Sequence, residues 1–354
     1  MMNALSKHPS EVSDFLLRDI AKKIQLKPAE HDLAERRYDD VYKFLNKDGG
    51  NPIYRRIYPQ GSMAVGATIA SKLSDDEFDI DVVLELHIDD GRYTPQMVLD
   101  WLHRELSSFP SCKIVRQSRC ITLEFPKMHL DVTPAILLPG PDRTSRIFHS
   151  KPACEEYTRI ANPWGFAEWF KDKTDRRHDQ TQRLFAKDMA SEPVPEQQTV
   201  DEKSNALICL QLVKRWRNIL YDNRNGRKPP SILLAKLVAD NARYFPTLLD
   251  ALDAQVAHLR KAFYDAWIQD QLIQVYNPTC PEHDKLSDRW PEDLNAQEQF
   301  ATDLAQLNYG DSAFNYLNYG DSAFNYLGIT GTKCTVTVIG KCTVTVIPRT
   351  FELR

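Results

Sequence analysis

Three acidic residues in two strand-like segments could together hold a divalent cation. Asp79 and Asp81 flank Ile80 in the segment DIDVVLEL, and alternation along a strand directs both carboxylates to the same side. Asp131 lies in a second apolar segment, HLDVTPA, where an isolated buried acid would be costly. If the two segments are neighbouring strands, three carboxylates converge, and their repulsion favours Mg²⁺, which prefers carboxylate and phosphate oxygens.

Three such carboxylates are enough to hold two metal ions. One ion would lower the pKa of an attacking hydroxyl, and the other would neutralise a triphosphate and its leaving group. Mg²⁺ is the expected ion and Mn²⁺ a possible substitute. A pair of acids spaced by one residue is often only exposed charge, and the preceding Asp75, Asp76 and Glu77 are interpreted as a solvated loop. Asp131 by itself could equally be a charge on an edge strand.

A glycine–serine pair upstream of the acidic strand favours the site over these simpler interpretations. Gly61 lets the backbone come close to a ligand, and Ser62 adds a hydroxyl. If a helix begins here, its free N–H groups form an anion site suited to a triphosphate. An isolated pair would be interpreted as a helix-capping serine. Ahead of Asp79 and Asp81, phosphate binding is the stronger hypothesis.

The elements that must position these residues follow from hydrophobic periodicity. Helices are predicted at residues 11–25, 29–46, 94–106, 166–171, 177–190, 202–221 and 231–241, with further helix over 244–275. A short helix is expected after the turn at residues 60–68, and strands are predicted at 53–58, 79–86, 113–115, 120–125 and 129–137. The pattern indicates an α+β chain, with a mixed-sheet lobe over residues 1–160 and a helical lobe over 161–354. A site is expected in the cleft between two such lobes.

The C-terminal region contains two perfect duplications. Residues 307–316 recur unchanged at 317–326, and residues 333–339 recur at 341–347. Repeat architectures normally diverge and need several units, so no function is assigned to residues 307–347. The alternating TVTV runs predict one terminal strand.

Composition narrows the class of protein further. The chain has 354 residues, 42% of them hydrophobic, and a net charge of −4, which argues against long duplex DNA as a partner. It has no apolar stretch long enough for a membrane span and no secretory leader, so a cytoplasmic location is expected. The seven cysteines are scattered without a CxxC pair, which predicts reduced thiols and no zinc site.

The segment GSMAVGAT, the DID strand and the later HLDVTPA together resemble the polymerase-β-type nucleotidyltransferase core. More narrowly, the chain is similar to the CD-NTases of bacterial CBASS anti-phage systems, relatives of cyclic GMP–AMP synthase. Further segments carry this resemblance, which covers most of residues 10–300: NPWGFAEWF from Asn162, LVKRWR around Lys214, PSILL around Ser231, and Asn277-Pro278 followed by Asp288-Arg289-Trp290. The chain shows no zinc insertion of the kind that senses DNA in cyclic GMP–AMP synthase.

The resemblance implies a polymerase-β-like lobe, a helical lobe and an active site between them. It implies that Asp79, Asp81 and Asp131 bind the metal, and that Gly61 and Ser62 hold the donor phosphates. Lys214 and Ser231 would assist from the helical lobe; by themselves they would be interpreted as a surface lysine and a helix N-cap. The implied substrates are ATP, with GTP, CTP or UTP as alternatives, and the implied partners are CBASS regulatory proteins.

Three functions are compatible with these residues. The first is an Mg²⁺-dependent synthase that joins NTPs into a cyclic di- or trinucleotide second messenger. The second is a nucleotidyltransferase that modifies RNA or protein with NMP; the net charge of −4 argues mildly against it. The third is an inactive binding module, which the presence of all three acids and the glycine–serine pair disfavours. Base identity, ring size, linkage, activator and oligomeric state are not determined by the sequence.

Overall fold

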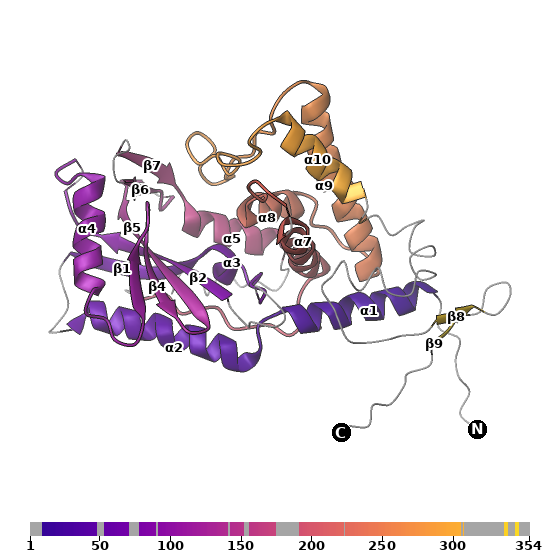
Figure 1. Cartoon of the computed structure of the whole chain (residues 1–354), viewed down its shortest axis with the longest axis horizontal. Coiled ribbons are helices and arrows are strands. Elements are labelled where there is room, and N and C mark those ends of the chain that lie inside the picture. The colour runs from indigo at the N-terminus through magenta and orange to yellow at the C-terminus, as the bar shows by residue number, and fades with distance from the viewer. Residues whose placement is uncertain are drawn as a thin grey trace.

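The structure is a computed structural model that describes residues 9–47, 53–70, 78–89, 91–140, 142–151, 156–174, 191–222, 224–305, 307, 336–338 and 344–346. A mixed sheet with its covering helices forms one part, and a group of helices forms the other (Figure 1). Helix α5 (Pro163–Thr174) and the four-residue α3 (Gly61–Ala64) lie between the two parts. The α+β class predicted from the sequence is therefore confirmed.

The sheet has seven strands, and its centre is a parallel pair. Strands β2 (Phe78–Leu86) and β5 (Met128–Leu137) pair in parallel, and every other neighbour is antiparallel. The path is β1-β2-β5-β4-β3, with β6 on β5 and β7 on β6. The remaining strands are β1 (Tyr54–Gln60), β3 (Lys113–Arg116), β4 (Ile121–Phe125), β6 (Ser145–His149) and β7 (Tyr157–Ala161).

One face of the sheet is buried under two helices. Helix α2 (Pro28–Leu45) contributes Tyr38 and Val41, and α4 (Pro95–Leu106) contributes Leu99 and Leu102, all fully shielded from water. They pack on alternate strand residues of the sheet, including Ile80. The predicted cap of α4 is confirmed, because its Thr94 side chain accepts from Met97 N–H at 3.3 Å. The opposite face is free of these helices, and the acidic residues face that way.

The helical part has its own core. It is built from α1 (Pro9–Ile24), α5, α7 (Asn205–Asp222), α8 (Ser231–Asp240), α9 (Leu248–Ile268) and α10 (Leu294–Ala305). Trp216 of α7, Trp290 and Phe300 are buried at its centre; the rings of Trp290 and Phe300 meet edge to face, 5.2 Å apart. Tight packing of such large side chains makes this part a rigid support for whatever α7 presents to the sheet.

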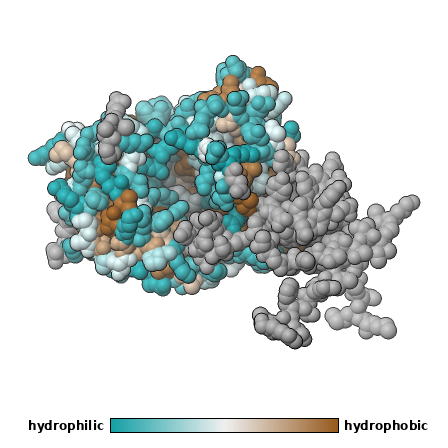
Figure 2. All heavy atoms as spheres, in the orientation of Figure 1, coloured by the Kyte–Doolittle hydropathy of each residue, from teal (hydrophilic) through white to brown (hydrophobic). Residues whose placement is uncertain are grey.

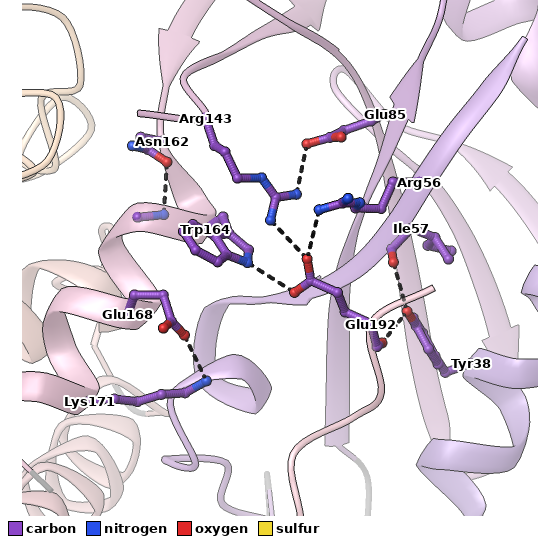
Figure 3. A network of polar contacts seen from close by, with 11 residues as sticks. Tyr38, Arg56, Ile57, Glu85, Arg143, Asn162, Trp164, Glu168, Lys171 and Glu192 are labelled. Atoms are coloured by element: carbon purple, nitrogen blue, oxygen red, sulfur yellow. Dashed lines mark hydrogen bonds and ion pairs between the residues drawn. The ribbon is translucent and has the colours of Figure 1, made fainter. Parts of the chain in front are cut away.

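A buried network of charges ties the sheet to the segment before α7 and to α5 (Figure 3). The Glu192 carboxylate accepts from Arg143 at 2.8 Å, from Arg56 at 3.3 Å and from the Trp164 indole at 3.0 Å. Arg143 also donates to Glu85 of β2 at 3.2 Å. Trp164 belongs to α5, and the arginines and Glu85 belong to the sheet and its loops. Glu192 therefore fixes the position of α5 relative to the sheet.

Several elements differ from the sequence-based predictions. Strands β6 and β7 and helix α10 were not predicted: β7 is a largely exposed edge strand without hydrophobic alternation, and α10 has a narrow apolar stripe. The helix predicted over 244–275 is shorter and spans Leu248–Ile268. Both TVTV runs form strands, β8 (Val336–Val338) and β9 (Val344–Val346), which pair antiparallel with each other; one terminal strand was predicted. Identical β-branched segments have equal strand propensity, so each can pair with the other.

Other predictions lie outside the described residues. These are the helix at 177–190, the acidic loop at 75–77 and the duplicated segment from 308 to 326. The boundary between lobes near residue 160 stays a prediction. Hydrophilic residues dominate the face of the described residues in Figure 2, with hydrophobic ones in separate patches. Among the described residues, no helix is both long and apolar enough to cross a lipid bilayer.

Candidate active site

The three acids lie together at one end of the central parallel strands. Asp81 of β2 is directly paired with Asp131 of β5, and Asp79 with His129. His129 Nδ1 lies 3.4 Å from the Asp79 carboxylate, whose side chain is 70% exposed. The Thr122 hydroxyl donates to Asp131 Oδ1 at 2.5 Å from the adjacent β4. The strand adjacency on which the sequence made the convergence of the acids conditional is therefore present.

The electrostatics of the acids favour a cation. Burial and, after it, the charge of Asp131 raise the pKa of Asp81 to about 6, while the charge of Arg119 opposes the rise. An ionised Asp81 is therefore destabilised until positive charge arrives. Among the described residues, no three His, Cys, Asp or Glu side chains are already closed around one point. The acids share a face and a strand end.

Gly61 brings the backbone against this group. It is the first residue of α3 and has φ +62°, in the left-handed region that favours glycine. A Cβ atom on Gly61 would lie 2.8 Å from Asp81 Oδ2. Glycine is thus required both by the backbone conformation and by the space beside the carboxylate. Gln60 occupies the N-cap position of α3 and Ser62 lies inside the helix, so the alternative interpretation of Ser62 as an N-cap is wrong.

Lys214 of α7 reaches across from the helical part to Ser62. Its Nζ donates to Ser62 Oγ at 2.8 Å and to the Ala67 carbonyl at 2.7 Å. Only 4% of Lys214 is exposed, so the surface-lysine interpretation is wrong. Burial and, after it, the charge of Arg217 lower the pKa of Lys214 to about 7, while the charge of Asp81 opposes the fall. Because α3 has only four residues, its dipole is small, and the anion-binding potential here rests on the Lys214 ammonium.

Ser231 makes no direct contact with Ser62 or Lys214 among the hydrogen bonds of the described residues, and it is connected to Lys214 through Arg217. It is the first residue of α8, whose N-cap is Pro230, so Ser231 is not a cap. Its hydroxyl accepts from Arg217 at 3.1 Å, and Arg217 also donates to the Pro229 carbonyl at 2.6 Å. Burial lowers the pKa of Arg217 to about 10. The serine is therefore linked to Lys214 through Arg217, whose charge is felt at the lysine.

Two further cations close to the acids were missed by the sequence reasoning. The charge of Lys228 lowers the pKa of Asp79 and of Lys214, so its ammonium lies within electrostatic range of both. Likewise, the charge of Arg119 lowers the pKa of Asp81, so its guanidinium lies within electrostatic range of that carboxylate. The signal for Lys228 was the basic run RNGRK just before Pro229-Pro230; Arg119 lies between two strands with no such signal.

The mixed sheet carries paired carboxylates on adjacent parallel strands, and a glycine–serine turn lies beside them. The helical part adds a buried lysine that contacts this turn. Together these features define a nucleotidyltransferase of the polymerase-β type. The family description "Second Messenger Oligonucleotide or Dinucleotide Synthetase domain" matches residues 12–173, which include the three acids, Gly61 and Ser62. The chain belongs to the CD-NTase family of enzymes.

Sequence and structural relatives agree with this membership. The chain is 35% identical over 316 residues to the cyclic dinucleotide synthase CdnG of Bradyrhizobium diazoefficiens, covering 84% of this chain and 74% of that protein. It is 24% identical over 278 residues to a c-di-GMP synthase of Roseivirga ehrenbergii, covering 77% and 71%. The structure of the Bradyrhizobium CdnG in complex with GTP superposes with a TM-score of 0.75 at 32% identity, covering 89% of this chain and 94% of that one. Escherichia coli MS115-1 CdnC with ATP shares the fold, with a TM-score of 0.60 at 18% identity and coverage of 89% and 98%.

Proposed function

We propose that this enzyme condenses two GTP molecules into a cyclic dinucleotide, with Asp79, Asp81 and Asp131 as metal-binding and catalytic residues. The observation that carries the proposal is the direct pairing of Asp81 with Asp131 on parallel strands, beside a Ser62 hydroxyl that is held by Lys214. Carboxylates and a phosphate-binding pair at one strand end are what in-line nucleotidyl transfer requires.

The three acids suit Mg²⁺, with Mn²⁺ as a substitute. Their donor set is all oxygen, and the burial and mutual repulsion that raise the pKa of Asp81 are relieved by a bound cation. When bound, two such ions would activate a ribose hydroxyl and neutralise the triphosphate.

The chain's own groups divide the remaining work. Asp131 is the proposed acceptor of the proton from the attacking hydroxyl, and the hydrogen bond from Thr122 fixes the orientation of its carboxylate. Lys214 and Ser62 bind the donor phosphates, and Gly61 allows them close to Asp81. Ser231 supports this group through Arg217.

The choice of GTP and of a two-base ring is drawn from the relatives. The protein 35% identical to this chain is a cyclic dinucleotide synthase, its structure holds GTP, and the second relative is a c-di-GMP synthase. ATP, CTP and UTP remain substrates to be tested. The transfer of NMP to RNA or protein is not favoured, because no relative named above carries it.

A role in anti-phage defence, with a regulatory CBASS protein as partner, follows from the family resemblance and belongs to the proposal. Plating cells that carry the gene against phage, beside cells that carry the Asp79→Asn/Asp81→Asn form, tests the defence role. Equal plaque counts in the two strains would contradict it.

The decisive experiment is mass spectrometry of the small molecules formed from ATP, GTP, CTP, UTP and Mg²⁺, after nuclease and phosphatase treatment. A resistant cyclic dinucleotide that contains guanine is expected. It should be absent with the Asp79→Asn/Asp81→Asn variant, which serves as the matched control. A product that persists in this variant would refute the assignment of the acids, and transfer only to added RNA or protein would favour the alternative function.

A further inference from the structure

We propose that Arg119, Arg159 and Arg289 bind the 5′-triphosphate of the acceptor nucleotide, whose ribose hydroxyl attacks the donor. These three residues are called the arginine patch below. The inference rests on the proposed function and adds a second anion site to it, separate from the donor site at Ser62 and Lys214.

The patch lies on the same face of the sheet as the acids. Asp131 and Ala135 share a face of β5 by alternation, and Ala135 is paired with Ile147 of β6. Ile147 is in turn paired with Arg159 of β7, so Arg159 is on that face as well. Ala135 and Ile147 pack in one small cluster with Tyr58 and Val83, which confirms that they share a face.

An aromatic pair forms the floor beside Arg159. His149 is paired with Tyr157, and their rings stack 4.7 Å apart with an interplanar angle of 8°. The Arg159 guanidinium lies over the Tyr157 ring at 5.4 Å. Tyr157 is 42% exposed and the Arg159 side chain likewise, while His149 is buried. The pair therefore supports Arg159 at the surface in a fixed direction.

Arg289 and Arg119 come to the same place from two other segments. Arg289 belongs to the Asp288-Arg289-Trp290 segment, whose Trp290 is anchored in the helical core while 42% of the Arg289 side chain is exposed. The loop before β4 carries Arg119, and its Ser118 carbonyl accepts from Ser150 N–H at 2.8 Å, next to His149. Burial lowers the pKa of His149 to about 4, and the charges of all three arginines act on it in the same direction.

Outside the acids of the active site, the arginine patch has more guanidinium groups than carboxylate neighbours. Asp288 forms ion pairs with Arg159 and, at 3.9 Å, with Arg289. Asp284 is nearby, but it accepts from the Asn277 side chain at 2.8 Å and from the Asn162 backbone at 3.2 Å. The structure shows no hydrogen bond from the Arg119 side chain to any other described residue. Apart from the acids of the active site, which Arg119 also faces, the three guanidinium groups outnumber these two carboxylates and keep free donors, which suits a phosphate chain.

The distance between the arginine patch and the acids fits the triphosphate of the acceptor nucleotide better than that of the donor. Continuing the β5–β6 register places His149 level with Thr133, two residues from Asp131. That separation is about 7 Å along the strand and about 5 Å across to the next strand. A nucleotide with its ribose hydroxyl at Asp131 can bridge this distance with its 5′-phosphates. The donor triphosphate is held elsewhere, by Lys214 on the helical side.

The test separates the two substrates chemically. Dideoxy-GTP serves as a donor that cannot accept, and α,β-methylene-GTP or GMP serves as an acceptor that cannot donate. Formation of the linear dinucleotide is followed in the wild-type enzyme and in the Arg119→Ala/Arg289→Ala variant, which leaves the Arg159–Asp288 ion pair in place. The control is Arg243→Ala, an exposed arginine that lies over Phe245 in the helical part. Thermal unfolding checks that all forms are folded.

We expect wild-type kcat/KM to be at least roughly tenfold higher with α,β-methylene-GTP than with GMP, the usual scale for charge-assisted hydrogen bonds. In the double variant the ratio should fall to within about twofold of one, while the KM for dideoxy-GTP stays unchanged. An unchanged ratio in the variant, or no preference in the wild type, overturns the inference. If no acceptor gives a dinucleotide with the wild type, the proposed function itself is refuted.

Calorimetric binding of α,β-methylene-GTP gives a readout that needs no turnover. The wild type should bind two molecules per chain, one at each triphosphate site. The double variant should bind one, and Arg243→Ala should still bind two. Two sites of unaltered affinity in the double variant would overturn the assignment of the arginine patch.

Discussion

Asp81 and Asp131 occupy directly paired positions on two parallel strands, so their carboxylates leave the sheet side by side. In an antiparallel sheet, two strands joined by a hairpin would bring two carboxylates side by side from residues that are close in the sequence. Here 50 positions of sequence, including a helix and two strands, separate the two acids. The parallel crossover therefore makes the site a property of the whole sheet, and any change that shifts the β2–β5 register removes it.

Asp81→Asn should abolish activity and stabilise the metal-free protein. The amide removes one of two facing negative charges, and the raised pKa of Asp81 shows that this charge is unfavourable before a cation binds. We expect a loss of at least about a thousandfold in dinucleotide formation and a gain of about 1–2 kcal/mol in unfolding free energy in EDTA. Urea denaturation with and without Mg²⁺ measures the second effect. Asp89→Asn, an exposed acid, is the control and should change neither quantity.

Binding of NTP should take up a proton at pH 8 through Lys214. Its pKa is lowered to about 7 in the free enzyme, so much of it is neutral at that pH, and a bound triphosphate favours the charged form. Affinity should therefore fall as pH rises above 7, by up to about tenfold per unit. Calorimetry in buffers of different ionisation enthalpy measures the uptake. Lys214→Met should abolish it, and an uptake that persists in this variant would contradict the assignment.

The same lowered pKa affects folding stability with a definite sign. Because the folded pKa of Lys214 lies below its unfolded value of 10.5, the unfolded chain binds more protons between pH 7 and 10.5. The contribution of Lys214 to stability should therefore rise with pH across that window. It is lost as pH falls toward 7, where the buried amine must carry charge. Comparing wild type with Lys214→Met across these pH values isolates this contribution.

Gly61→Ala should reduce activity far more than a substitution with the same backbone strain elsewhere. The new Cβ would lie 2.8 Å from Asp81 Oδ2 and would displace the carboxylate. We expect a loss of about a hundredfold or more in kcat, since small misplacements at a reacting centre have effects of this size. Gly91→Ala is the matched control: it has φ +82° and nothing within 4 Å of its Cβ. Equal losses in both variants would show that strain alone is responsible.

Glu192→Gln should destabilise the fold by about 3 kcal/mol or more, because buried Arg56 loses its carboxylate partner and buried Arg143 keeps only Glu85. Arg56 and Arg143 are mostly shielded from water, with side chains 14% and 10% exposed. Breaking the exposed Lys261–Asp265 pair with Asp265→Asn should cost under about 1 kcal/mol and serves as the control. Urea denaturation compares the two. A change in Glu192→Gln as small as in the control would show that the network in Figure 3 does not hold the sheet to α5.

The strands and helices around the site were predictable from local pattern because each carries a strong signal. The DIDVVLEL and HLDVTPA segments alternate or run apolar, and Thr94-Pro95 marks a helix start. Strand β7 and helix α10 lacked such a signal, since an exposed edge strand and a narrow stripe need little hydrophobic periodicity. Their positions are set by pairing with β6 and by packing against α9.

The sequence by itself determined the chemistry available to this protein: three acids in strand-like segments, a glycine–serine turn and a basic helix. Only the tertiary structure decided which of these groups meet. It paired Asp81 with Asp131, buried Lys214 against Ser62, placed Arg217 rather than Lys214 on Ser231, and brought Arg119, Arg159 and Arg289 together. The physical reason is that strand order and helix packing are set by burial of apolar surface over the whole chain, and a local pattern carries no record of which distant segment will lie beside it.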